Sequence, residues 1–489
     1  MAKRVSVIDI GSNSVRMDIY EKTSRFAFHL LHEEKSKVRI SENAYQYNGV
    51  LQETPMQRTF DALKDFLDIS KSFKVRKVLC VATSALRDAP NKQEFIQKVK
   101  EKLKLNIKII SGEKEAYYGA IACANLLPSQ EKALSIDIGG GSTEFAFIDD
   151  KNVSSTISLE LGTVRLKELY FDRDDIDGAK KYIDSQLATL PTLDISTLIG
   201  IGGTFRAVSN AIMKNSNYPL NKLHGYEYAV DTFKSFISDV LVADEERLKE
   251  LGIKNNRFDV IKPGTLILKR IIKKLKISKI VTSGVGVREG VYLSDLLRNS
   301  KDKFPHNYNT SVAYLIDSHI PNTHYSNQLN TLVKKLFDLT QTHLGIDTQY
   351  RYELALAAKL YPCGSNVHYY SQNKHTYYLI QSALEYGFTH SSITLIATLT
   401  KYAKSKLPAE CHLQKYAELL PSPRNTNALS YLLSLAIALL SHRPRNLDFE
   451  MSFEDGVLYI ESENKLYITK DVVSKLECNN REFSIEFNS

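Results

Sequence analysis

The sequence of 489 residues predicts an α/β protein with two lobes and a cleft between them, followed by a helical region and a small tail. Residues 135–148 read as a strand, a turn with three glycines and a returning strand. Residues 7–20 repeat this pattern and align with it without a gap at an offset of 128 residues. Strands and helices alternate after each segment, as in α/β folds. Self-similarity at a fixed offset indicates a duplicated structural unit.

Length and composition are those of a globular protein with several domains. The chain is too long for one core and should divide into about three or four domains. Its hydrophobic fraction is 43% and its charged fraction 25%. The net charge of +8 is a modest excess that is compatible with a polyanionic ligand or with a role in solubility. There is no Lys/Arg block typical of a nucleic-acid tail, so we expect no nucleic-acid partner.

Cysteine usage and hydropathy favour a cytoplasmic location. The five cysteines are scattered without a C-x-x-C pair, which favours a reduced compartment and implies neither zinc nor disulfides. The start, Met1 to Arg4, runs directly into a strand, so we expect no signal peptide. The most apolar run, 431–440, is far shorter than the ~18 residues of a membrane span, and we expect a buried helix there and no membrane association.

The first lobe is expected over residues 1–127. Ser111 should cap a helix that runs to about Leu126, with early glutamates favoured by the helix dipole. The expected strands are 5–10, 15–20, 77–82 and 107–110.

The second lobe is expected over residues 128–300. A strand that ends in Gly200 to Gly203 and another that ends near Gly284 should follow its hairpin. Helices are expected near 164–190, over about 231–275 and up to about Leu297.

The remainder divides into two parts. Residues 301–445, which begin in a polar linker, have a strongly helical pattern. The tail at 446–489 should be β-rich or mixed, because it contains short runs such as 457–460 and 466–468.

The two hairpin tips predict a phosphate-binding cleft. Glycines let the backbone bend through φ > 0 and bring its N–H groups close to an anion. Asp9 and Asp137 end the first strand of each hairpin and should face one Mg²⁺, which typically uses one or two carboxylates when it is bound to phosphates. The candidate phosphate ligands are Gly11, Ser12, Asn13 and Ser14 at one tip and Gly139, Gly140, Gly141 and Ser142 at the other.

The chemistry expected in this cleft is hydrolysis. The chain has neither a G-x-x-x-x-G-K-[ST] run nor the G-x-G-x-x-G spacing, which argues against a P-loop NTPase and a Rossmann domain. Water attack on a phosphoryl group, assisted by metal and carboxylates, suits the residues present. Gly202, Gly203 and Thr204 would line the cleft where a nucleoside or a longer chain could lie.

Two residues outside the hairpins are further candidates for roles in this hydrolysis. Arg87 follows a strand end and could neutralise a phosphoryl oxygen, although a lone arginine is more often simply exposed. Glu115 lies in a first helical turn and could accept a proton from water, although a glutamate there more often complements the helix dipole.

Seven motifs occur in order over about residues 1–300. They are Asp9-Ile-Gly-Ser-Asn-Ser-Val-Arg16, Ala82-Thr-Ser-Ala-Leu-Arg-Asp-Ala89, Ser111-Gly-Glu-Lys-Glu-Ala116, Asp137-Ile-Gly-Gly-Gly-Ser-Thr-Glu144, Gly200-Ile-Gly-Gly-Thr204, Leu223-His-Gly-Tyr226 and Arg288-Glu-Gly290. Together they resemble the exopolyphosphatase/guanosine pentaphosphate phosphohydrolase (Ppx/GppA) family, of the superfamily of actin, hexokinase and the chaperone ATPases. The resemblance implies two actin-like (ribonuclease H-like) lobes. The sugar-kinase and chaperone branches would not be expected to carry Ala-Thr-Ser-Ala-Leu-Arg.

The resemblance also implies an activity and roles for residues. The family removes terminal phosphate from inorganic polyphosphate, and the 5′ γ-phosphate from guanosine pentaphosphate, with Mg²⁺. Glu115 matches the glutamate that activates water, Glu144 a second essential carboxylate near metal and water, and Arg87 a phosphate-binding arginine. Asp137 and Asp9 then fall in the metal and phosphate loops. Lys114 departs from the family, where an acidic residue is common at that position.

The helical region resembles the third domain of long family members, itself related to HD-type phosphohydrolases. Where such an enzyme needs adjacent His-Asp ligands, this chain has Tyr361-Pro362, and a later histidine position reads Lys401. We therefore expect a domain without catalysis that holds substrate or forms dimer contacts. The remaining candidate ligands are His324, His368 and His375.

The sequence leaves three questions open: the class of reaction, the substrate and assembly state, and the role of one basic run. A kinase of the same superfamily and a sensor that binds polyphosphate or alarmone without turnover are the alternatives to a hydrolase. The long C-terminal region leans toward polyphosphate over guanosine pentaphosphate as substrate, and the resemblance makes a homodimer plausible. Nine basic residues within 254–279 could guide a polyanion, or could simply cover a solvated helix face.

Overall fold

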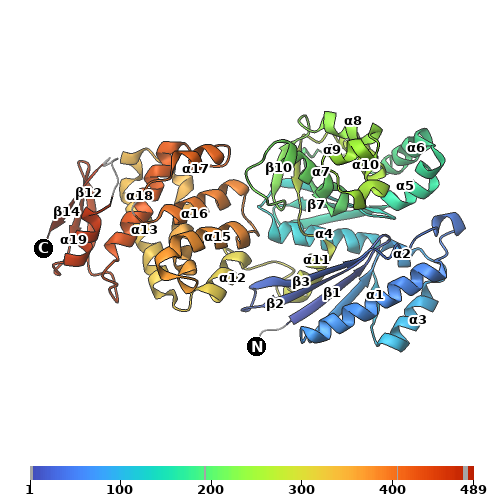
Figure 1. Ribbon diagram of the computed structural model, residues 1–489, viewed down its shortest axis with the longest axis horizontal. Helices are drawn as coiled ribbons and strands as arrows, with labels where there is room; N and C mark the ends of the chain where they lie inside the picture. Colours follow the sequence, from blue (N-terminus) through green and yellow to red (C-terminus); the bar gives the residue numbers. More distant parts are fainter. Residues whose placement is uncertain (1–3, 192–193, 405, 477–482, 489) are drawn as a thin grey trace. The chain divides into compact units, whose positions relative to one another are not determined.

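The computed structural model describes residues 4–191, 194–404, 406–476 and 483–488. The chain divides into two compact units, Met1–Tyr308 and Asn309–Ser489 (Figure 1). Unit 1 contains two α/β lobes, and unit 2 contains helices with a small sheet. In the part of the chain that is described, no helix is both long and apolar enough to cross a bilayer.

Lobe I is built on a five-stranded sheet in the order β3-β2-β1-β4-β5. β1 and β2 form the predicted hairpin, and β4 runs parallel to β1. Side chains of α1 and α3 share a core with this sheet. The elements are β1 (Arg4–Ile10), β2 (Val15–Lys22), β3 (Phe28–Ser36), α1 (Glu53–Ser72), β4 (Lys77–Ala82), α2 (Ser84–Arg87), α3 (Lys92–Leu103), β5 (Ile107–Ile109) and α4 (Gly112–Leu126).

Lobe II repeats this plan with one extra edge strand, in the order β10-β11-β9-β6-β7-β8. β6 begins at Lys132 and β1 at Arg4, which is the predicted offset of 128 residues. The predicted duplication is therefore confirmed in strand order and in register. The elements are β6 (Lys132–Ile138), β7 (Thr143–Asp149), β8 (Asn152–Leu159), α5 (Thr163–Leu169), α6 (Ile176–Leu187), β9 (Thr197–Ile201), α7 (Gly202–Asn215), β10 (Tyr226–Ala229), α8 (Lys234–Val242), α9 (Glu245–Glu250), α10 (Phe258–Leu275), β11 (Lys279–Thr282) and α11 (Val287–Leu296).

Two helices, α4 and α11, cross in close contact within unit 1. A Cβ at Gly290 would lie 1.9 Å from the carbonyl oxygen of Tyr118, so only glycine permits this approach. Ser111 caps α4 as predicted, since its side chain accepts a hydrogen bond from the Lys114 amide at 3.2 Å. The capping bond fixes the first turn of α4, and the close contact at Gly290 fixes α11 against α4.

Unit 2 is a helical domain with a small sheet that shares its hydrophobic core. The apolar run 431–440 lies in a buried helix, as predicted. The tail is mixed, one of the two predicted outcomes, because Val457–Glu461 is a strand and Tyr467–Ser474 forms helix α19, which buries Thr469 near α18. The other elements are α12 (Thr310–His319), α13 (Thr323–Leu344), α14 (Arg351–Leu360), α15 (Gln372–Ala383), α16 (His390–Tyr402), α17 (Glu410–Lys415), α18 (Pro423–Leu439), β12 (Glu450–Glu454), β13 (Val457–Glu461) and β14 (Ser484–Asn488).

The boundary between the units lies between Tyr308 and Asn309, a few residues after the predicted start of the polar linker. Residues up to Tyr308 cluster with unit 1. Phe304 and Tyr308 pack their rings against Phe26, at centroid distances of 6.4 and 5.7 Å. The Tyr117 hydroxyl donates to Asp302 at 2.9 Å. These contacts hold the end of the linker on the lobes.

Candidate active site

The two hairpin tips close in the same way. The Gly11 amide donates to the Ser14 carbonyl at 3.2 Å, and the Gly139 amide donates to the Ser142 carbonyl at 3.0 Å. Asp9 pairs with Arg16 across the first hairpin, and Asp137 pairs with Glu144 across the second. The duplicated loops are thus equivalent in backbone structure but carry opposite charges on their returning strands.

The glycines of the second tip are required by close packing. The expectation of φ > 0 at Gly139, Gly140 and Gly141 is wrong, because none of them adopts the left-handed region. A Cβ at Gly140 would lie 2.8 Å from the Cβ of Ser12, and one at Gly141 would lie 2.4 Å from the Tyr45 hydroxyl. The missing side chains therefore let the second tip approach lobe I.

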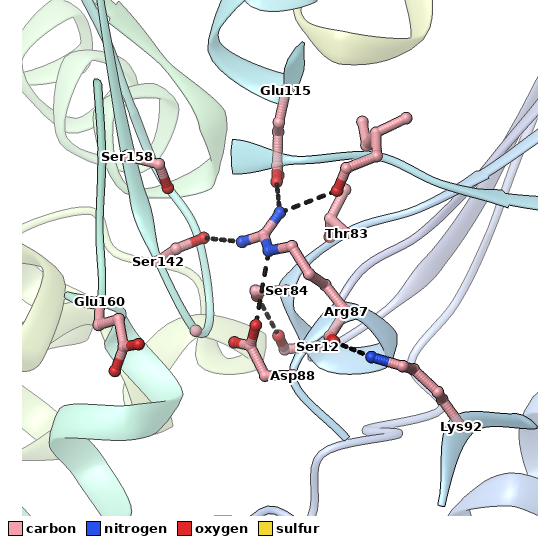
Figure 2. Close-up of polar contacts among 12 residues, drawn as sticks. Ser12, Thr83, Ser84, Arg87, Asp88, Lys92, Glu115, Ser142, Ser158 and Glu160 are labelled. Carbon is pink, nitrogen blue, oxygen red and sulfur yellow. Dashed lines mark hydrogen bonds and ion pairs between the residues drawn. The ribbon is translucent and has the colours of Figure 1, made fainter. Parts of the chain in front are cut away.

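A cavity of about 160 Å³ lies at these tips. Figure 2 shows the part of the site around Ser12, Ser84 and Arg87. Among the residues predicted from the sequence, Arg87, Gly141 and Glu144 do not line the cavity itself. Those that line it are Asp9, Gly11, Ser12, Asn13, Ser14, Glu115, Asp137, Gly139, Gly140, Ser142, Gly202, Gly203 and Thr204.

Arg87 connects the two lobes beside the cavity (Figure 2). It ends α2, the single helical turn that follows β4. Its Nη1 lies 3.1 Å from Oε2 of Glu115 and donates to the Ile110 carbonyl at 3.2 Å. Its Nη2 donates to Oγ of Ser142 at 3.4 Å. The guanidinium therefore lies between the predicted base of lobe I and the phosphate loop of lobe II.

Glu115 and Glu144 are both buried, with 9% and 2% of their surfaces exposed. Burial raises the pKa of Glu144 to about 8, with Asp137 adding to the shift and hydrogen bonds from Ser142 and Ser158 opposing it. Burial and the charge of Glu144 raise the pKa of Glu115 well above its usual value, while Arg87 lowers it. Two buried carboxylates whose pKa values are raised above their usual range suit acid–base chemistry.

Asp9 and Asp137 supply a second pair of buried carboxylates. Burial, with Asp9 nearby and Arg206 opposing, raises the pKa of Asp137 to about 6, and burial also raises that of Asp9. Among the described residues, Oδ1 of Asp9 has no hydrogen-bond partner. No group of three or more His, Cys, Asp or Glu in the described chain is arranged to hold a metal. Two carboxylates with an unsatisfied buried oxygen nevertheless fit Mg²⁺, which takes its other ligands from phosphate and water.

A set of basic residues that sequence reasoning did not assign to the site lines the same cavity. We name Arg16, Lys35, Arg206 and Arg257 the basic wall. Burial and the neighbouring arginines lower the pKa of Arg16 to about 10 and that of Lys35 to about 8. Cations that depress one another's pKa in this way favour a bound anion.

The run of basic residues at 254–279 contributes one member to this wall. Arg257 lies against Gly203, where a Cβ would come 2.3 Å from its Nη1. Arg270, farther along α10, forms an ion pair with Asp184 instead. Lys279 lies 3.7 Å from Glu227. The run therefore divides between a cleft residue and residues that pair elsewhere on the surface of lobe II.

Arg288 is a further residue that the sequence did not single out for the site. It is 7% exposed, lines the cavity from the first turn of α11, and lies with Nε 2.7 Å from Oδ2 of Asp18. The Tyr20 hydroxyl is 2.9 Å from the same Asp18 oxygen and 3.0 Å from Oε1 of Glu289. This buried network joins β2 to α11. A signal was present, since Arg288 begins one of the recognised motifs.

In unit 2, the candidate ligands His324, His368 and His375 do not form a metal cluster within the described residues. Nε2 of His324 lies 2.6 Å from the Arg445 carbonyl oxygen. Lys401 lies with Nζ 3.2 Å from Nδ1 of His412 and over the ring of Tyr377. The ammonium group of Lys401 therefore lies beside the imidazole of His412.

Comparison with known families decides the assignment. A family model described as the Ppx/GppA phosphatase family matches residues 18–299, and one for domain III of Ppx/GppA phosphatases matches residues 309–476. The chain belongs to the Ppx/GppA phosphatase family.

Individual Ppx/GppA relatives support a phosphoanhydride hydrolase. The chain is 27% identical to a guanosine-5′-triphosphate,3′-diphosphate pyrophosphatase of Photobacterium profundum, over 95% of this chain and 91% of that protein. It is similar to the crystal structure of an Aquifex aeolicus family member (TM-score 0.54, 28% identity, 61% of this chain and 99% of that one). It is also similar to an exopolyphosphatase from Cytophaga hutchinsonii (TM-score 0.57, 26% identity, 62% and 100%). The chain is accordingly an enzyme that hydrolyses phosphoanhydrides.

Proposed function

We propose that this Ppx/GppA chain removes the 5′ γ-phosphate of guanosine pentaphosphate, and terminal phosphate of inorganic polyphosphate, with Mg²⁺. The observation that carries the proposal is one cavity that combines the hairpin tips, Glu115 and the two aspartates with the four cations of the basic wall. The cations of the basic wall would pair with the phosphates of a nucleotide that carries them on both its 5′ and 3′ positions.

Two further observations bear on substrate choice. The guanosine-5′-triphosphate,3′-diphosphate pyrophosphatases match both units of this chain, over about nine tenths of their own length. The exopolyphosphatase of C. hutchinsonii supports polyphosphate as a second substrate through its similarity to about three fifths of the chain. A linear polyphosphate would present its phosphates to the same cations of the cavity.

The proposed reaction begins with the terminal phosphoryl group held between the two tips. Backbone amides of Ser12 to Ser14 and of Gly140 to Ser142 donate to its oxygens, and Arg87 neutralises their charge. Glu115 accepts a proton from the attacking water as its oxygen bonds to phosphorus and the phosphoanhydride P–O bond breaks. The bond pair stays on the leaving phosphate oxygen. Glu144, beside Arg87 and Ser142, accepts a hydrogen bond from the attacking water and so orients it.

Asp9, Asp137 and Glu144 would hold Mg²⁺ in this proposal. Bound there, Mg²⁺ would supply charge neutralisation at the phosphate oxygens and would lower the pKa of the surrounding carboxylates. Glu115 would then accept the proton in its ionised form. A homodimer is a further expectation from the family resemblance, tested by sedimentation of the full chain.

The experiment is a comparison of kcat/KM for guanosine pentaphosphate and inorganic polyphosphate in the wild type, Arg257→Ala and Arg270→Ala. Arg257→Ala should lower kcat/KM for guanosine pentaphosphate by roughly tenfold, and more than for a short polyphosphate, because one charged contact contributes about 1.5–3 kcal/mol. Arg270→Ala is the matched control, because Arg270 belongs to the same basic run, 254–279, but forms an ion pair with Asp184. Equal activity of all three on guanosine pentaphosphate would contradict the proposed substrate site.

A further inference from the structure

Unit 1 contains a second and larger cavity, remote from the catalytic chemistry. Its volume is about 500 Å³, against about 160 Å³ for the catalytic cavity. We name it the α11 pocket, because Tyr292, Asp295 and Leu296 from the last turns of α11 line it. Arg288 and Glu289, from the first turn of the same helix, line the catalytic cavity. One helix of 10 residues, about 15 Å long, therefore separates the two sites.

Positive charge converges on the α11 pocket from several elements. Six basic side chains line it, namely Arg4, Lys22, Arg25, Arg76, Lys77 and Arg298. The carboxylate that lines it, Asp295, lies 2.5 Å from Nζ of Lys77 and 3.4 Å from Nη1 of Arg298. Glu21 lies beside Arg4, at 3.0 Å from Nε. Among the described residues that line the pocket, six are cations and one is a carboxylate, so the lining carries net positive charge.

A buried hydroxyl at the wall of the pocket independently indicates a polar ligand. Tyr292 is 1% exposed, and its ring stacks on that of Tyr20 with centroids 4.4 Å apart. Within the described chain its hydroxyl finds no hydrogen-bond partner. A buried polar group without a partner is uncommon in native proteins, and a bound ligand is one way to satisfy it.

We propose that the α11 pocket binds a phosphate-rich anion of the size of inorganic tripolyphosphate, separately from the catalytic cavity. Arg25 and Arg76 are exposed lining residues that would attract the anion, and the buried Tyr292 hydroxyl would supply a donor. Such binding depends on charge and weakens as salt increases. The pocket lies wholly within unit 1, so the site needs no other part of the chain.

The test is a calorimetric titration of the full chain with inorganic tripolyphosphate, in chelator so that no turnover occurs. The double variant Arg25→Glu/Arg76→Glu should lose one class of binding site relative to the wild type, with at least a tenfold weaker affinity for it. The control Lys100→Glu/Lys102→Glu reverses two exposed charges on α3, outside the pocket. It should keep both classes. Tyr292→Phe, which preserves the ring packing, should weaken the same site several-fold.

Two results would overturn the proposal. One is an unchanged titration in the Arg25→Glu/Arg76→Glu variant when its thermal unfolding shows a folded protein. The other is an equal loss in the α3 control, which would show attraction to overall charge alone. Phosphate release is measured separately, so that a failure of the proposed function is distinguished from a failure of the pocket. The pocket variant should retain turnover at saturating substrate, because neither Arg25 nor Arg76 lines the catalytic cavity.

Discussion

Nη1 of Arg87 lies 3.1 Å from Oε2 of Glu115, and the same guanidinium reaches Oγ of Ser142 through Nη2 at 3.4 Å. The arginine therefore contacts both the predicted base and the second phosphate loop. In the proposed mechanism, a terminal phosphoryl group held at Ser142 would draw the guanidinium toward its own oxygens. Glu115 would then be left nearer to water, and the pair would link phosphate binding to activation of the base.

Arg87→Lys should lower kcat for phosphate release by roughly 10²-fold, because an ammonium cannot keep the fork of contacts that a guanidinium makes with carboxylate and phosphate. The single positive charge remains, so the fold should be retained. Steady-state kinetics together with thermal unfolding separate these effects. An Arg87→Lys enzyme within threefold of the wild type would show that the fork of contacts is not needed.

Gly140→Ala should disturb the approach of the two lobes. The added Cβ would lie 2.8 Å from the Cβ of Ser12, so the second tip must move away from the first. We expect kcat/KM to fall by roughly tenfold or more, since even small misplacement of reacting groups is costly. Fluorescence-monitored unfolding should show a change in stability of no more than about 1–3 kcal/mol, as for other overpacked sites. Normal kcat/KM in a folded Gly140→Ala enzyme would argue against closure at this contact.

The pH dependence of substrate binding should reflect Lys35. Burial and nearby arginines lower the pKa of this side chain to about 8, so it loses its positive charge as the pH rises through that value. The KM for guanosine pentaphosphate should therefore rise several-fold between about pH 7 and about pH 9, because an anion loses one cationic contact. Lys35→Gln should start with a higher KM and lack this rise. An identical pH profile in the variant would assign the effect to another group.

Stability without divalent cations should fall as the pH rises from about 4 to about 7. The pKa of Asp137 is raised by burial to about 6, so the folded state holds this proton more tightly than the unfolded chain does. Its contribution, about 3 kcal/mol, is present at low pH and lost as the pH rises through the folded value. Chemical unfolding of Asp137→Asn should show a shallower decline than that of the wild type. Mg²⁺ should stabilise the wild type more at pH 8 than at pH 5, and equal effects at both would contradict a carboxylate metal site.

Local patterns allowed the sequence to predict the hairpins and the helix that begins at Gly112. Asp9 and Asp137 each end an apolar strand and precede a glycine turn, so their place at the tips follows from a few neighbouring residues. The duplicated offset then predicted two equivalent lobes. The conformation of the glycines was not predictable in this way. Gly140 is required because of Ser12 in the other lobe, which no local pattern reveals.

The basic wall shows the same limit more clearly. Arg16 lies on β2, Lys35 on β3, Arg206 on α7 and Arg257 just before α10, so four separate elements must meet before the set exists. Each residue alone reads as an ordinary surface cation. Helix α19 was not distinguished from a strand for a different reason, since a short apolar run is compatible with either a strand or a helix until it packs. Tertiary contacts decided each of these cases.

The central claim is that Glu115 accepts the proton of the attacking water, and Glu115→Gln tests it most directly. Glu113→Gln is the matched control, because Glu113 is an exposed glutamate in the same helical turn. With guanosine pentaphosphate and Mg²⁺, kcat for phosphate release should fall roughly 10²–10⁴-fold in Glu115→Gln, while substrate binding and thermal stability are retained. Glu113→Gln should release phosphate at the wild-type rate. Wild-type turnover by a folded Glu115→Gln enzyme would contradict the account.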